Sequence, residues 1–182
     1  MIKKILLGAI VVIVLVVAIF CVVVAMQPSH YHIERSATMN APSSVVFNQV
    51  NDFHKWDAWS PWAKLDPNIK TSYEGAPAGP GAMYSWTGNS QVGEGRMTIT
   101  DSKPAELVKI KLEFIKPFAA VNATNFMFTP QGNQTAVKWT MDGDNTFMGK
   151  AFGLFMNMDK LVGGDFEKGL AQMKAVSETA AK

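Results

Sequence analysis

Six strand-like runs follow one another along the middle of the chain, and together they constrain the fold more than any other feature. They are KTSYEG, AMYSWTG, QVGEGRMTITDS, ELVKIKLEFI, AVNATNFMFTP and TAVKWTMDG. The segments between them are short and rich in Gly, Pro, Asn and Ser, the residues that turns prefer. Connections this short predict antiparallel hairpins, because parallel neighbours need a long crossover.

The runs predict a sheet with one apolar face and one wet face. Within ELVKIKLEFI, the residues from Val108 to Phe114 alternate strictly between an apolar side chain and a lysine or glutamate. In TAVKWTMDG, Val137, Trp139 and Met141 point opposite to Lys138 and Asp142. The apolar face must be covered by another element.

The rest of the soluble part supplies that cover. From Thr146 to Val176 apolar residues recur at helical spacing, and the pair Gly163–Gly164 predicts a bend or a break in this helix. Upstream, HYHIERSATM predicts one more strand and PSSVVFNQVND a short helix. We therefore expect an α+β domain in which seven antiparallel strands are covered by a long C-terminal helix.

An apolar run precedes this domain. Residues 5–26 carry no charge, and a helix of this length spans ~33 Å, enough to cross the hydrocarbon core of a bilayer. A retained transmembrane helix is the preferred interpretation, and a cleaved signal peptide is the alternative. The only cysteine, Cys21, lies inside this run, so no intramolecular disulfide can form.

Charge around the run predicts its orientation. Lys3 and Lys4 precede it, and the next basic residue is Arg35, so the N-terminus is expected in the cytoplasm. The expected organisation is a cytoplasmic segment 1–4, a membrane helix 5–26, a linker 27–30 and a domain 31–182 on the periplasmic or extracellular side. The net charge of +2 and the scattered basic residues argue against nucleic acid as a partner.

The segment FHKWDAWSPW, residues 53–62, holds three of the five tryptophans at three-residue spacing. Aromatic residues at this density predict the wall of a cavity or a tightly packed corner. His54 and Asp57 lie among them and are the only candidates for acid-base catalysis. Each also has a structural interpretation, because a histidine on a helix surface and a helix-capping aspartate are both common.

Other polar residues predict little chemistry. Glu94 and Arg96 share a strand face opposite Met97, which favours a solvated pair, and the nearby glycines favour close packing or a β-bulge. No HExxH motif or cysteine pair is present in the sequence, so we expect neither a metal site nor a cofactor.

Three segments carry a resemblance to a known group of proteins: VNDFHKWDAWSPWAKLDP, WTGNSQVGEGRMTIT and GLFMNMDKLVGGDFEKGL. With the order of elements, they resemble the START-like helix-grip superfamily, also called SRPBCC, and within it the polyketide cyclase/dehydrase branch with an N-terminal membrane helix. The resemblance covers roughly Tyr31 to Ser177. It implies a curved sheet of seven strands wrapped around the C-terminal helix, with an apolar tunnel between them.

The resemblance and the phase of the elements together predict which residues line the tunnel. They are Trp56, Trp59, Trp62, Trp86, Met97, Phe114, Phe126, Phe128, Trp139, Phe155, Met158, Val162, Phe166 and Met173. We expect a membrane-anchored domain that binds a hydrophobic small molecule, lipid-like or aromatic. A cyclase- or dehydratase-like enzyme and a protein-interaction module at the membrane surface are the alternatives, and the sequence identifies no protein partner.

Overall fold

The computed structural model describes residues 2–182, with side chains from Lys4 onward. A long helix leads into a domain of seven strands and four further helical segments. The elements are α1 (Ile2–Ala25), β1 (His30–Met39), α2 (Ser43–Asn51), the 3-10 helix η1 (Phe53–Ala58), β2 (Lys70–Gly75), β3 (Ala82–Thr87), β4 (Glu94–Lys103), β5 (Leu107–Lys116), β6 (Ala120–Gln131), β7 (Gln134–Asp144), α3 (Phe147–Gly153) and α4 (Met158–Ala180).

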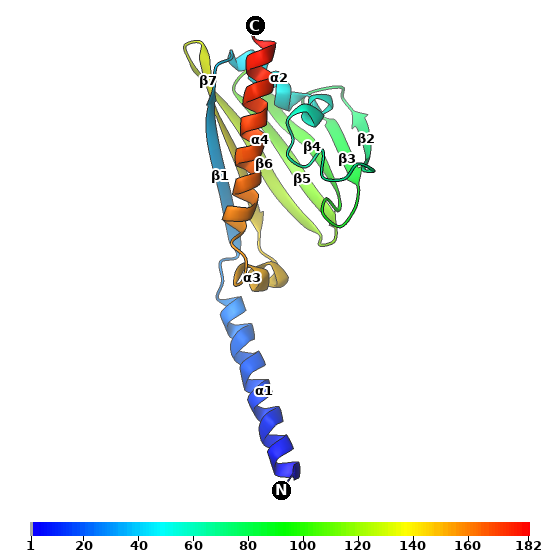
Figure 1. The fold of residues 1–182 in the computed structure, drawn as a ribbon, viewed down its shortest axis with the longest axis vertical. Coiled ribbons are helices and arrows are strands. Elements are labelled where there is room, and N and C mark those ends of the chain that lie inside the picture. The colour runs from blue at the N-terminus through cyan, green and yellow to red at the C-terminus, as the bar shows by residue number, and fades with distance from the viewer. Residues whose placement is uncertain (1) are drawn as a thin grey trace.

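The expected seven-stranded antiparallel sheet is confirmed. Its strand order is β1-β7-β6-β5-β4-β3-β2, so each hairpin lies beside the next and β1 closes onto the last strand. Figure 1 shows the sheet curving around α4, with α1 extending away from the domain and α3 beside the end of α1. The C-terminus lies at the end of the domain opposite α1.

Two glycines allow α4 to lie close to the sheet. A Cβ at Gly169 would lie 2.8 Å from the ring of Trp139, and a Cβ at Gly163 would collide with the guanidinium of Arg35. Arg35, on β1, fills that space and bonds two carboxylates of α4: Nη1 to Asp159 at 3.0 Å and Nε to Glu167 at 2.7 Å. Packing and charge together hold α4 on β1.

This arrangement corrects two details of the expected C-terminal helix. The helix does not break at Gly163–Gly164, because α4 is continuous there and the sheet fills the space beside Gly163. The break lies at residues 154–157, where the Asn157 side chain caps α4 by accepting a hydrogen bond from Lys160 N. Phe155 was expected to face the sheet from this helix; instead it precedes α4 and is 78% exposed.

The first helix contains a span of 22 residues, Lys4–Ala25, that is long and apolar enough to cross a membrane. Its side chains are almost all exposed, as expected for a segment whose surroundings are lipid rather than protein. A signal sequence has the same properties, so these properties alone define an apolar N-terminal helix.

Candidate functional site

The aromatic segment of residues 53–62 packs into the core. Trp59 is fully buried, Trp56 is 5% exposed, and Trp62 is half-buried. The two buried indole N–H groups donate to main-chain oxygens of α2, Trp56 to Val50 O at 3.0 Å and Trp59 to Gln49 O at 2.9 Å. These bonds join η1 to α2 and direct the rings toward the sheet.

Trp139, on β7, is the centre of the packed region. Its ring stacks on Phe166 of α4 at 3.9 Å between centroids and on Phe126 of β6 at 4.7 Å. Trp59 meets it edge-on at 5.8 Å. This part of the space between the sheet and α4 is therefore filled by side chains.

The predicted lining residues fall into three groups. Eight lie in the buried core: Trp56, Trp59, Met97, Phe126, Phe128, Trp139, Phe166 and Met173. Trp62, Trp86, Phe114 and Val162 are half-buried on the inner side of the sheet or its covering elements. Phe155 and Met158 are exposed near α3. Their role in ligand binding stays a prediction.

His54 and Asp57 do not form an acid-base pair in a cavity, since both are exposed. His54 stacks on Tyr73 at 4.1 Å, and its Nδ1 lies 3.0 Å from Asp52 Oδ1. Asp52, not Asp57, caps η1 by accepting a hydrogen bond from His54 N. Asp57 is not buried among the tryptophans, because those rings turn inward while its carboxylate faces solvent.

Glu94 and Arg96 lie on the outer face, as their phase predicted, and each pairs across the sheet with β5. Lys116 Nζ donates to Glu94 at 2.7 Å, and Arg96 donates to Glu113 at 2.9 Å. A Cβ at Gly95 would enter the ring of Trp86, and the register shifts between Glu94 and Gly95. Close packing and a bulge therefore both explain the glycine.

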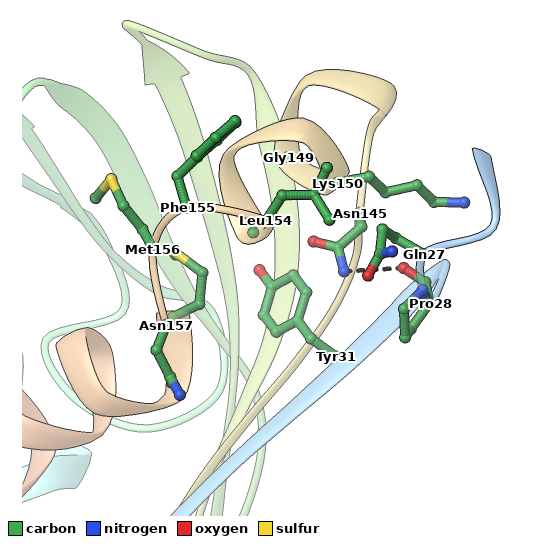
Figure 2. A pocket seen from close by; sticks show the side chains of 12 residues that line it. Gln27, Pro28, Tyr31, Asn145, Gly149, Lys150, Leu154, Phe155, Met156 and Asn157 are labelled. Carbon is green, nitrogen blue, oxygen red and sulfur yellow. Dashed lines mark hydrogen bonds between the residues drawn. The ribbon is translucent and has the colours of Figure 1, made fainter. Parts of the chain in front are cut away.

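A hollow lies between the start of β1, the linker and α3. It has a volume of about 460 Å³ and is partly open to solvent. Its apolar lining comes mainly from Leu154, Phe155, Met156 and Met158. Figure 2 shows the first three of these beside Tyr31 and Asn145. Small-molecule sites typically measure ~300–1,000 Å³. This hollow, which we call the α3 pocket, is the candidate site.

Polar groups lie on the inner wall of this pocket. The Tyr31 hydroxyl donates to Asn122 Oδ1 at 2.7 Å, and burial raises the pKa of Tyr31 above its ordinary value, which keeps the hydroxyl protonated. Asn122 itself is 2% exposed and does not line the pocket, and neither does Thr124, the next inward-facing position along β6, whose buried hydroxyl has no partner. Lys150 also lines the pocket; its side chain extends towards the linker, where Nζ donates to Ser29 Oγ at 2.8 Å (Figure 2).

Most pocket residues were not among the predicted lining residues; only Phe155 and Met158 were. The missed ones include Tyr31, Asn145, Lys150, Leu154 and Met156. One signal was present in the sequence, since residues 147–156 are all apolar or glycine except Lys150, so that a helix here has almost no polar face. A helix of that kind does not suit an ordinary solvated surface.

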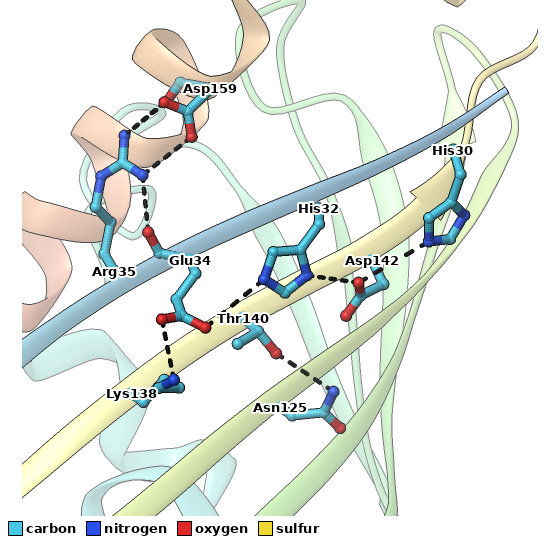
Figure 3. Close-up of polar contacts among 9 residues, drawn as sticks. All are labelled: His30, His32, Glu34, Arg35, Asn125, Lys138, Thr140, Asp142 and Asp159. Carbon is cyan, nitrogen blue, oxygen red and sulfur yellow. Dashed lines mark hydrogen bonds and ion pairs between the residues drawn. The ribbon is translucent and has the colours of Figure 1, made fainter. Parts of the chain in front are cut away.

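A second polar cluster lies on the outer face of β1 and β7 (Figure 3). His32 Nδ1 is 2.6 Å from Asp142 Oδ1, and this hydrogen bond raises the pKa of His32. His30 approaches Asp144 at 3.0 Å, and Lys138 approaches Glu34 at 3.0 Å. Among the described residues, no group of three or more His, Cys, Asp or Glu side chains could hold a metal ion. The cluster is a set of cross-strand ion pairs on a solvated surface.

A seven-stranded antiparallel sheet wrapped around a C-terminal helix defines the helix-grip fold of the SRPBCC superfamily. Residues 30–178 match the family model described as polyketide cyclase / dehydrase and lipid transport, and the chain belongs to this family. No curated protein matches the sequence.

Solved structures show the same fold at low identity. A protein from Chromobacterium violaceum is 12% identical with a TM-score of 0.59, over 81% of this chain and 96% of that one. The Zhui aromatase/cyclase from Streptomyces sp. R1128 is 15% identical with a TM-score of 0.59, over 84% and 96%. One further match is the di-domain aromatase/cyclase StfQ of the steffimycin biosynthetic pathway, at 11% and a TM-score of 0.60, over 84% and 52%.

Proposed function

We propose that this protein binds a hydrophobic or amphipathic small molecule in the α3 pocket while α1 anchors it in a membrane. The observation that carries the proposal is the pocket itself, about 460 Å³ in volume, which combines an apolar wall with a few polar groups. The family description includes lipid transport, which supports this class of ligand.

The pocket's chemistry narrows the ligand further. Leu154, Phe155, Met156 and Met158 present an apolar and, through methionine, adaptable surface. Of the described residues that line the pocket, none is acidic, and Lys150 supplies a positive charge. The favoured ligand is therefore an apolar chain or ring system with a neutral or negatively charged polar group.

The anchor and its orientation belong to the same proposal. Lys4–Ala25 fits a bilayer in length and composition, and the lysines before it favour a cytoplasmic N-terminus. The domain of residues 31–182 then lies on the periplasmic or extracellular side. Carbonate extraction of membranes and the mass of the mature N-terminus check this part, because a cleaved protein would be released with a new N-terminus.

A pocket-blocking variant tests ligand binding. A Cβ at Gly153, which lines the pocket, and a Cβ at Gly164, which does not, both have open space around them. Gly153→Phe should fill the pocket, whereas Gly164→Phe adds the same bulk elsewhere. Native mass spectrometry of the full chain should detect an apolar ligand in the wild type and in Gly164→Phe, and lose it in Gly153→Phe. Absence of a ligand from all three, or equal retention in all three, contradicts the proposal.

A cyclase-like activity is the second candidate, favoured by the two solved aromatase/cyclases of the same fold. Tyr31 and Lys150 are the groups in the pocket that could transfer protons, in place of the exposed His54 and Asp57. Tyr31→Phe keeps the ring and removes the hydroxyl, so an enzyme would lose turnover while a binding protein would keep its ligand. Incubation of wild type and variant with a poly-β-ketone substrate analogue, followed by product analysis, discriminates the two.

A further inference from the structure

Exposed apolar side chains gather at one end of the domain. Phe147, Met148 and Phe152 of α3, Phe155 and Met156 after it, and Phe118 in the β5–β6 turn are each between 45% and 78% exposed. Phe118 and Phe152 join the two segments, with ring centroids 6.1 Å apart. We call these six residues the α3 surface. Apolar patches of this kind mark sites where protein or membrane is bound.

The helix in this surface lacks the packing that normally stabilises a short helix. None of the seven residues of α3 is buried. An isolated helix shorter than ~12 residues is marginal in water, and most helices in proteins gain their stability from a buried apolar face. The Thr146 side chain caps α3 by accepting a hydrogen bond from Gly149 N at 3.1 Å, but a cap covers no apolar surface. A partner that covers α3 would supply the missing burial.

The position of α3 indicates that this partner is the membrane. Asn145 N donates to Ser29 O at 2.9 Å and Asn145 Nδ2 to Pro28 O at 3.1 Å, which ties the linker to the segment before α3. In the structure, four residues, 26–29, separate the end of α1 from the start of β1, and a segment of this length reaches ~14 Å at most. α3 contacts α1, and Val24, in the last turn of α1, is completely buried. If Lys4–Ala25 spans the bilayer, α3 lies at the level of the lipid headgroups.

The charge of this region suits the same partner. Residues 145–158 contain no aspartate or glutamate and one lysine, Lys150. Aromatic and other large apolar side chains with a nearby cation are typical of segments that lie in the membrane interface. An acidic segment would instead be repelled by anionic lipids.

We infer that the α3 surface is inserted in the interfacial layer of the leaflet from which α1 emerges. This inference rests on the anchoring role proposed for α1. It gives the domain a second membrane contact and orients it on the bilayer. Since Leu154–Met158 also line the α3 pocket, the pocket then borders on lipid. An amphipathic ligand can pass between leaflet and pocket without crossing water.

Site-specific labels in the full chain test the contact. Cys21 is the only cysteine, so a Cys21→Ala background accepts single cysteines at chosen positions. Phe155→Cys places a label on the α3 surface, and Asn133→Cys places one in the exposed β6–β7 turn at the opposite end of the domain. Both variants carry the fluorophore NBD in phosphatidylcholine–phosphatidylglycerol liposomes, with and without nitroxide-labelled lipid.

The expected result is blue-shifted emission at position 155 that lipid nitroxides quench, with neither effect at position 133. Water-like emission at both positions overturns the inference. A blue shift at 155 without nitroxide quenching also overturns it, since protein, such as a second copy of the chain, would then cover the surface. Carbonate extraction of the same liposomes separates the two proposals: release of the chain contradicts the anchor, whereas retention with an unquenched label contradicts only the contact of α3.

Discussion

Two glycines of α4 provide a matched test of how closely this helix approaches the sheet. Gly164→Ala and Gly169→Ala make the same chemical change in the same helix, and each gains up to ~1 kcal/mol from the higher helix propensity of alanine. A Cβ at Gly164 meets nothing within 4 Å. A Cβ at Gly169 lies 2.8 Å from Trp139 Cζ3 and 3.2 Å from Pro61 Cδ.

The difference in unfolding free energy between the two variants measures the steric cost of the added Cβ alone, because the gain in helix propensity is the same in both and cancels. The Trp139 ring is held on both faces, by Phe166 and Phe126, and cannot turn aside. Overpacking of this kind costs ~1–3 kcal/mol. Gly164→Ala should therefore be more stable than wild type by ~0.5–1 kcal/mol, and Gly169→Ala less stable than Gly164→Ala by ~1–3 kcal/mol.

Thermal unfolding of the full chains in one detergent, followed by near-ultraviolet circular dichroism, provides the measurement. For a domain of this size, 1 kcal/mol corresponds to ~2–4 °C in Tm. Equal midpoints for the two variants, or a higher one for Gly169→Ala, would refute the close packing of α4 on Trp139. That result would also make the space around Trp139, between the sheet and α4, a possible ligand site.

The remaining predictions concern individual side chains. Trp59→Ala should cost ~3–5 kcal/mol of unfolding free energy, because the side chain is fully buried, and a near-neutral melting temperature would mean that it is not. Hydrogen bonding to Asp142 raises the folded-state pKa of His32, so its stabilisation is complete below the unfolded pKa of ~6.5 and is lost as pH rises through the folded value. The Tm difference between wild type and His32→Gln should accordingly shrink from pH ~5.5 to pH ~8.5; a constant difference would contradict this linkage. Asp57→Asn and His54→Gln should leave the bound ligand detected by mass spectrometry unchanged, and its loss in either variant would restore a site in the aromatic segment.

Features that depend on residue periodicity were predictable. The turn residues between the runs specify antiparallel hairpins. The alternation from Val108 to Phe114 fixes which face of its strand is buried, because a one-residue slip in register would turn every charged side chain into the core. The outward orientation of Glu94 and Arg96 follows from the same period. Which partners they bond did not follow, since Lys116 and Glu113 come from the neighbouring strand.

Features that depend on what lies beside a residue were not predictable. Gly163–Gly164 has low intrinsic helix propensity, yet the helix continues through it because Arg35 and the sheet occupy the adjacent space. In the aromatic segment, the hydrogen bonds of Trp56 and Trp59 to α2 turn the rings inward and leave Asp57 in solvent. Neither the packing beside Gly163 nor the hydrogen bonds of the two tryptophans can be predicted from residue identity alone.

The sequence by itself determined the α+β helix-grip class, the apolar N-terminal helix and the family, because each depends on patterns along the chain. The tertiary structure decided where the space inside the grip remains. Stacking of Trp139 with Phe166 fills one part of the grip, and the hydrogen bonds of Asn145 to the linker bring α3 beside α1. The α3 pocket is formed by segments more than a hundred residues apart, which meet only when β1 pairs with β7.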